Sequence, residues 1–148
     1  MEYTICPAEI RHIDSLEALE QACFSLPWTR DQLVSQLPDE QHVFLVADSG
    51  NGQVLGYVGM MVVLDEGYIS NVAVSPDHRR KGIADALMRA LLCEADRRSL
   101  SFVTLEVREH NEAAIKLYEK WGFRPVGKRK NYYERPAEDA ILMTTFLK

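Results

Sequence analysis

The sequence has little of what marks several classes of protein. Only three of its 148 residues are cysteine, and none stands in a Cys-x-x-Cys or other zinc spacing, so we expect reduced thiols and no metal. No apolar run approaches the ~18 residues of a membrane-spanning helix, and the N-terminus carries no basic-then-apolar signal. Acidic residues outnumber basic ones by 22 to 17, which disfavours general nucleic-acid binding. We therefore expect a soluble cytoplasmic protein with no membrane or nucleic-acid partner.

Two common nucleotide-binding motifs are also absent. Without Gly-Lys-Ser/Thr the chain is not a P-loop NTPase, and no Gly-x-Gly-x-x-Gly follows its first strand, as a dinucleotide-binding domain would require. A chain of 148 residues suits one domain that buries about two-thirds of its unfolded surface. We therefore treat residues 1–148 as a single domain.

Hydrophobic periodicity divides the chain into about seven strands and about four helices. The expected strands are 3–6, 42–47, 54–63, 68–74, 102–107, 123–128 and 140–146, and the expected helices lie in 10–23, 29–37, 82–96 and 111–121. Asn51-Gly52 predicts a hairpin, Gly56 and Gly59 predict a bend or bulge, and residues 131–136 predict a loop. The strand–helix–strand unit from 68 to 107 favours parallel pairing. The expected fold class is α/β of the α+β type, with a mixed, mostly antiparallel sheet.

The stretch from Asn71 to Asp85 organises the chain. Residues 72–74 form a β-rich run that Ser75-Pro76-Asp77 ends, and a helical apolar stripe begins at Ala84. A helix start has free amides and a positive dipole end, and the small residues Gly82 and Ala84 allow close approach of a ligand. With three cations just before it, this turn could hold a pyrophosphate. An ordinary helix start with a solvated basic turn explains the same spacing.

Three motifs carry a resemblance to a known family. Arg79-x-x-Gly82-x-Ala84 resembles the signature of the Gcn5-related N-acetyltransferases, which bind acetyl-coenzyme A. The stretch 105–123 resembles the last motif of that family. Residues 129–133 and 138–141 are similar to those of its bacterial ribosomal-protein-alanine N-acetyltransferases. The resemblance covers nearly the whole chain and implies splayed central strands, with the pantetheine arm in their gap. It implies cofactor-binding positions at Val72, Ala73, Val74, Arg79, Arg80, Lys81, Gly82, Ile83, Ala84, Asp85 and Asn111.

Acetyl transfer from a thioester to an amine needs a proton acceptor for the ammonium group and a donor for the leaving thiolate. Glu106 lies inside an apolar strand and is the candidate base. The alternatives are a glutamate paired with an arginine such as Arg108 and a glutamate at a solvated strand end. Tyr118 is the candidate acid, and a core tyrosine is the alternative. The resemblance favours the catalytic role for both residues. It also implies that Asn111 contacts the cofactor, although this residue is a good helix N-cap. Cys93 is expected to be a small buried hydrophobe, so we predict direct transfer in a ternary complex.

The resemblance implies that the acceptor is the N-terminal alanine of a small-subunit ribosomal protein. Its path would run between the Pro27-Trp28 loop and the loop of Tyr132 and Tyr133. Trp28 could instead cap the core. Acidic residues nearby are expected to attract a basic peptide; they are Glu134, Glu138 and Asp139. Two alternatives stay open, namely a small-amine acetyltransferase of the same fold and a non-catalytic coenzyme A sensor. We expect a monomer.

Overall fold

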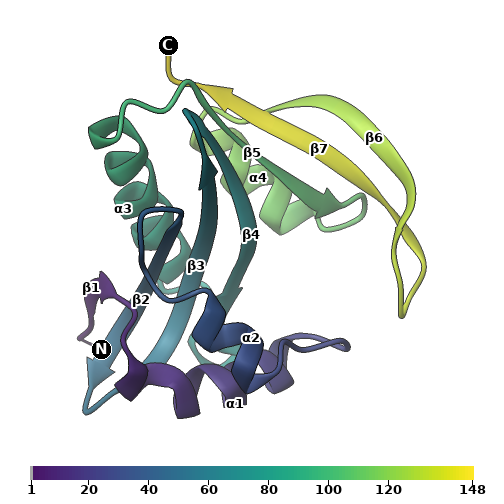
Figure 1. The fold of residues 1–148 in the computed structure, drawn as a ribbon. Coiled ribbons are helices and arrows are strands. Elements are labelled where there is room, and N and C mark those ends of the chain that lie inside the picture. Colours follow the sequence, from purple (N-terminus) through teal and green to yellow (C-terminus); the bar gives the residue numbers. More distant parts are fainter. Residues whose placement is uncertain (1) are drawn as a thin grey trace.

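The computed structural model describes residues 2–148, in which seven strands form one sheet in the order β1-β2-β3-β4-β5-β7-β6 (Figure 1). The strands are β1 (Thr4–Pro7), β2 (His42–Gly50), β3 (Gln53–Val63), β4 (Glu66–Val74), β5 (Phe102–Arg108), β6 (Arg124–Tyr133) and β7 (Glu138–Phe146). The helices are α1 (Ile13–Cys23), α2 (Arg30–Ser35), α3 (Ile83–Arg97) and α4 (Glu112–Lys120). Within this part of the chain β4 and β5 pair in parallel and all other pairs are antiparallel. The predicted mixed, mostly antiparallel sheet is confirmed.

Strand β2 carries apolar side chains on both faces, which places it between two hydrophobic layers. Val43 and Ala47 pack in the layer that contains α3, whereas Phe44 and Val46 pack in the layer that contains α1. This alternation follows from the two-residue period of a strand. The stripe that α3 buries is Ile83, Leu87, Met88, Leu91 and Ala95. Helix α1 buries Ile13, Leu16, Leu19 and Glu20. In Figure 1, α3 and α4 accordingly cover one face of the sheet and α1 and α2 cover the other.

Two local predictions about strand β3 are confirmed. The hairpin to β2 turns at Asn51 and Gly52, whose φ angles are +54° and +81°, as a tight turn of this class requires. The register of β3 against β4 changes between Gly59 and Met60, where a bulge was expected. The register of β2 against β3 also changes between Ala47, which pairs with Gly56, and Asp48, which pairs with Val54, so both glycines lie at an irregularity.

The C-terminal hairpin differs from the sequence-based expectation. Residues 131–136 were expected to be a loop, but β6 continues to Tyr133, which pairs with Glu138 on β7. An irregularity between Arg129 and Tyr133 absorbs the polar stretch, and the Asn131 N–H donates to Asp139 Oδ1 at 2.8 Å. Residues 134–136 form the turn between the strands, so the prediction was wrong only for 131–133, where the aromatic pair prefers extended backbone.

The first helix also begins later than expected. Ile10–His12 is a single 3-10 turn, in which Ile10 is exposed and His12 is fully buried. None of the helices described is long and apolar enough to cross a membrane.

Candidate active site

The parallel pair β4–β5 separates part-way along its length and leaves a gap in the middle of the sheet. Backbone pairing joins only Glu66–Tyr68 to Phe102–Thr104, although β4 continues to Val74 and β5 continues to Arg108. The two ribbons diverge from that point in Figure 1. Past the paired residues, the facing edges of the two strands have no strand partner in the described chain. The predicted splayed central strands are therefore confirmed.

The turn between β4 and α3 presents the expected cationic helix start. Gly82 is the N-cap of α3, and its φ of +79° favours glycine even though a Cβ there would meet no neighbour within 4 Å. Arg80 and Lys81 are exposed, while Arg79 bends back so that its Nε donates to the Val74 carbonyl at 3.3 Å. Free amides, positive charge and an open glycine fit the phosphates of a bound nucleotide.

Other predicted cofactor positions have additional structural roles. Asp85 accepts hydrogen bonds from Lys120 Nζ at 2.5 Å and Trp121 Nε1 at 2.8 Å, which join α3 to α4. The bond from Lys120 holds the pKa of Asp85 below its ordinary value. Ile83 is 1% exposed and packs in the core, so its backbone alone can face a ligand. Asn111 caps α4, because its Oδ1 accepts the Ala114 N–H at 3.2 Å. Its side-chain amide group is left to contact a ligand.

Glu106 lies on β5 just beyond the point where β4 departs. Its side chain is 24% exposed, and Oε2 lies 3.3 Å from Arg129 Nε on β6. The partner is therefore Arg129 rather than Arg108, which instead places its guanidinium 4.4 Å from the ring centre of Tyr133. The candidate base is at the gap, partly screened, and paired with a cation from the next hairpin.

Tyr118 reaches the same region from α4. It is 8% exposed, and its ring packs against Phe123 with centres 5.8 Å apart. Burial raises the pKa of Tyr118 to about 12. Burial also raises the pKa of Tyr133, with further contributions from Tyr132, Glu106 and Tyr118. Glu106, Tyr118 and Tyr132 are thus each within electrostatic reach of Tyr133, and Tyr118 enters any reaction as a neutral proton donor.

The two loops predicted to border the acceptor path contact each other. In the α1–α2 connection, Ser25 Oγ donates to the Arg135 carbonyl in the β6–β7 turn at 2.8 Å. Trp28 is half-buried and packs against the cluster under α1, so it contributes to the core as well as to the loop. Tyr132 is 50% exposed and its ring stands perpendicular to that of Tyr133, with centres 5.0 Å apart.

The acidic residues of the C-terminal hairpin are mostly occupied by the chain itself. Glu138 accepts from the His110 N–H at 2.8 Å and from Arg108 at 3.2 Å, and these bonds hold its pKa below the ordinary value. Asp139 binds the Asn131 N–H and lies 3.5 Å from Lys128. Glu134 is exposed. Of the three, Glu134 is the one most available to a basic peptide.

Comparison with known proteins identifies the family. Residues 13–123 match the Acetyltransferase (GNAT) family. The chain belongs to this family. It is 35% identical over 142 residues to the ribosomal protein bS18-alanine N-acetyltransferase of Escherichia coli (strain K12), covering 95% of each chain. Its fold matches the crystal structure of the ribosomal-protein-S18-alanine N-acetyltransferase from Escherichia coli with a TM-score of 0.90, at 34% identity, over 99% of this chain and 95% of that one.

A more distant structure shares the GNAT fold. Arabidopsis thaliana NAA60, solved in complex with acetyl-CoA, gives a TM-score of 0.89 at 21% identity over 99% of each chain. The likeness supports the fold, and the family match makes this chain an acetyltransferase.

Some residues near the site of this GNAT protein were not predicted. Glu20 is 1% exposed and binds both the α1–α2 loop and Tyr57. Its position, seven residues after Ile13 and four after Leu16, falls on the buried stripe of α1, and that spacing could have identified it. Cys93, expected to be buried, is exposed on α3. That expectation was wrong because Cys93 lies on the side of α3 that faces away from its buried stripe, together with Asp85 and Arg89.

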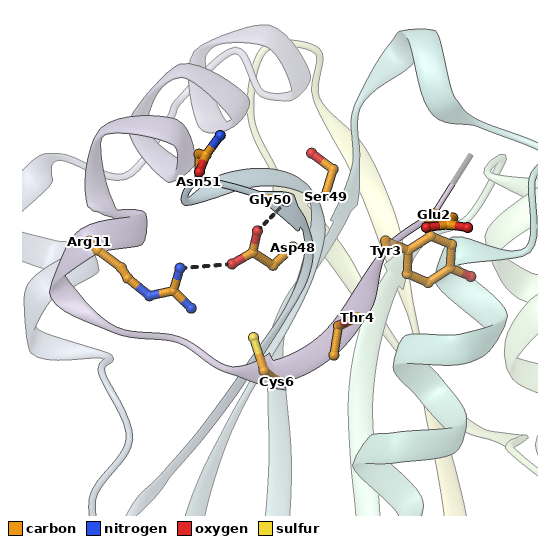
Figure 2. Close-up of a pocket in the computed structure, with 9 residues that line it drawn as sticks. All are labelled: Glu2, Tyr3, Thr4, Cys6, Arg11, Asp48, Ser49, Gly50 and Asn51. Atoms are coloured by element: carbon orange, nitrogen blue, oxygen red, sulfur yellow. Dashed lines mark hydrogen bonds and ion pairs between the residues drawn. The ribbon is translucent and has the colours of Figure 1, made fainter.

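A hollow at the opposite edge of the sheet lies apart from these groups. Figure 2 shows Cys6, Arg11 and Asp48 among its lining residues. Cys6, His12 and Asp48 place potential metal ligands within 4.8 Å of one another. However, His12 Nδ1 accepts the Glu9 N–H at 3.0 Å, which leaves Nε2 to donate to Asp48 Oδ2 at 2.8 Å. Arg11 lies 3.1 Å from the same oxygen. Internal hydrogen bonds therefore account for the cluster.

Proposed function

We propose that this GNAT enzyme transfers an acetyl group from acetyl-CoA to the N-terminal α-amine of a protein, with the alanine of ribosomal protein bS18 as the preferred acceptor. The observation that carries the chemistry is the β4–β5 gap with Glu106 on one side, Tyr118 near it and a cationic helix start at its end. The similarity to the bS18-alanine enzyme, which extends over 95% of each chain, supports the acceptor.

The donor would lie in the gap with its phosphates at the first turn of α3. The amides after Gly82 and the side chains of Arg80 and Lys81 would bind the phosphates. The free edge of β4 at Val72–Val74 offers backbone groups to the pantetheine arm. These contacts hold the thioester carbonyl beside Glu106, because β5 lines the other side of the gap.

Glu106 serves as the proton acceptor in this mechanism, acting through a water molecule. It takes a proton from the acceptor ammonium group, and the freed lone pair forms the bond to the thioester carbon. As this bond forms, the carbonyl π electrons move to oxygen, and the nitrogen gives its second proton to water. When the carbonyl re-forms, the carbon–sulfur bond breaks and its electron pair remains on sulfur, to which Tyr118 donates a hydrogen bond and solvent a proton. Glu106 returns its proton to solvent. Arg129 keeps Glu106 directed toward the gap and adds positive charge that opposes a second cation there.

The acceptor path would pass between Trp28 and the Tyr132–Tyr133 pair. The Ser25–Arg135 contact closes one end of this path and directs the peptide toward Glu106. Glu134 is free to attract a cationic second residue. Direct transfer needs no acyl-enzyme, and Cys93 plays no part in it; an acetyl-enzyme isolated after incubation with acetyl-CoA alone would overturn this step.

The test measures release of free coenzyme A with a peptide beginning Ala-Arg and with a panel of small amines. Wild type should prefer the peptide, and Glu106→Gln should lose turnover about 10²- to 10⁴-fold while still binding acetyl-CoA. Glu119→Gln, an exposed carboxylate on α4, is the matched control and should behave as wild type. Preference for a small amine would discard the peptide acceptor. Binding of acetyl-CoA without turnover of any acceptor would favour a sensor.

A further inference from the structure

Glu20 is a buried carboxyl group that the steps above do not use. It is 1% exposed within α1 and forms no ion pair with any residue in the described chain. Removing a carboxylate from water without a cation beside it costs stability. An apolar side chain would avoid that cost, so the reason for a carboxyl group should lie in what it binds.

Its two oxygens hold two different parts of the fold. Oε1 accepts the Trp28 N–H at 2.7 Å, and Oε2 accepts the hydroxyl of Tyr57 on β3. Tyr57 is fully buried, and its oxygen in turn accepts from Asn71 Nδ2 on β4 at 3.2 Å. One side chain therefore connects the α1–α2 loop to β3 and, through Tyr57, to β4.

The two ends of this chain of hydrogen bonds lie on opposite sides of the proposed reaction. Trp28 belongs to the loop that borders the acceptor path. Asn71 immediately precedes Val72–Val74, the edge of β4 proposed to hold the donor. It also lies at the β4 bulge, where the register skips one residue: Gly59 pairs with Asn71 and Met60 pairs with Ile69. The geometry therefore fixes the acceptor loop relative to the donor strand.

We propose that Glu20 is a positioning residue that sets acceptor affinity by anchoring the inner side of the Trp28 loop to β3 and β4. The inference rests on the proposed function. Elsewhere in residues 2–148 the loop is held by the Ser25–Arg135 bond, by the contact of Cys23 Sγ with the Val74 carbonyl at 3.5 Å, and by packing of Phe24 and Trp28. Without the inner anchor, the loop must be ordered again each time the acceptor binds, and that ordering weakens binding.

Glu20→Gln tests the proposal with little change in volume. A glutamine offers one accepting oxygen, so it cannot accept from both groups. With that oxygen on the Trp28 N–H, the Tyr57 hydroxyl loses the acceptor of its own proton and can only accept from the amide group. We expect the KM for the Ala-Arg peptide to rise about tenfold, while the KM for acetyl-CoA and kcat stay within about twofold. Glu17→Gln is the control: it removes the same charge one turn earlier, where the side chain is 37% exposed and 3.6 Å from Arg30. A lower Tm with both KM values unchanged, or both rising together, would overturn the proposal.

Tyr57→Phe provides a second measurement that does not depend on Glu20→Gln folding. It keeps the Trp28 bond and cuts the link to β4, so the peptide KM should rise about threefold with acetyl-CoA unaffected. The double variant should be no worse than Glu20→Gln alone, because both changes cut one pathway. An unchanged peptide KM in Tyr57→Phe, or effects that simply add, would contradict the inference. The acceptor preference of wild type tests the proposed function separately. The ratio of KM values between each variant and wild type is measured with whichever acceptor wild type prefers.

Discussion

Replacing Tyr118 with phenylalanine distinguishes two ways in which this residue could assist the leaving thiolate. The change removes one hydroxyl and keeps the ring that packs against Phe123. Within residues 2–148 the hydroxyl has no hydrogen-bond partner, so its removal leaves no buried polar group without a hydrogen bond. Any loss of activity can then be attributed to the catalytic step and not to a less stable fold.

The magnitude follows from the pKa of about 12 that burial gives Tyr118. Taking about 8.5 for an alkyl thiol, complete proton transfer to the thiolate is uphill by about 3.5 units, or about 4.8 kcal/mol. A hydrogen bond donated to the charged sulfur instead contributes about 1.5–3 kcal/mol. At about 1.36 kcal/mol per decade, the hydrogen bond corresponds to a loss of about 10- to 150-fold in kcat. Stabilisation without full proton transfer is the favoured role.

The assay is kcat from coenzyme A release at saturating donor and acceptor, near pH 8, with acetyl-CoA affinity measured in parallel. Tyr68→Phe is the matched control, because Tyr68 lies on β4 at its paired end. A loss near 10⁴-fold would refute the hydrogen-bond role in favour of complete proton transfer. An unchanged kcat would remove Tyr118 from the mechanism.

Three further outcomes concern stability. Folding raises the pKa of Tyr118 from 10.0 to about 12, so the folded state favours the protonated phenol. This stabilisation is complete below pH 10 and is lost as pH rises through 12. Over that range, urea denaturation should show that wild type loses up to about 2.7 kcal/mol more unfolding free energy than Tyr118→Phe. The His12 hydrogen bond holds the pKa of Asp48 below 3.8, so the stability that ionised Asp48 contributes is present above that value and is lost on acidification. Asp48→Asn should therefore lower the free energy of unfolding by about 1–3 kcal/mol at pH 7. The same loss of stability at pH 2 would contradict this. Gly56→Ala would place the new Cβ 2.8 Å from the Ala73 carbonyl oxygen and should lower the free energy of unfolding by about 1–3 kcal/mol. Gly127→Ala, whose new Cβ has its nearest neighbour 3.8 Å away, should be about as stable as wild type. Equal effects of the two changes would refute the steric argument.

Local signals predicted the elements whose conformation is decided locally. Asn51-Gly52 needs positive φ angles at both positions, and this requirement is independent of the rest of the fold. The stripe of α3 repeats every 3.6 residues and begins beside a glycine that adopts a left-handed conformation. Such features depend on residues within one or two turns of each other, so the sequence displays them directly.

The splayed strands could not be derived from spacing and were expected from the family resemblance. The separation of β4 from β5 depends on the bulge opposite Gly59 and on the pairing of β5 with β7, which comes from a distant part of the chain. The Glu106 partner shows the same limit. Arg108 was the nearest arginine along the strand and lies on the same face of β5 as Glu106. Its guanidinium, however, binds Glu138 and the carbonyls of Glu134 and Pro136, and Arg129 pairs with Glu106 from the β6 edge.

Polar residues near the site illustrate why composition alone misjudges their roles. Glu138 lies in an acidic stretch that suggests peptide attraction, yet Arg108 and His110 bring their donors to it from 30 and 28 positions away. Glu20 is the reverse case, since a carboxylate on a helix is usually solvated, but here its place on the apolar stripe directs it inward. For both residues, the position in the hydrophobic pattern indicates which way the side chain points. Its role depends on the residues that the fold brings next to it. A carboxylate on the buried stripe of α1 should therefore be weighed as part of the site before it is dismissed as surface charge.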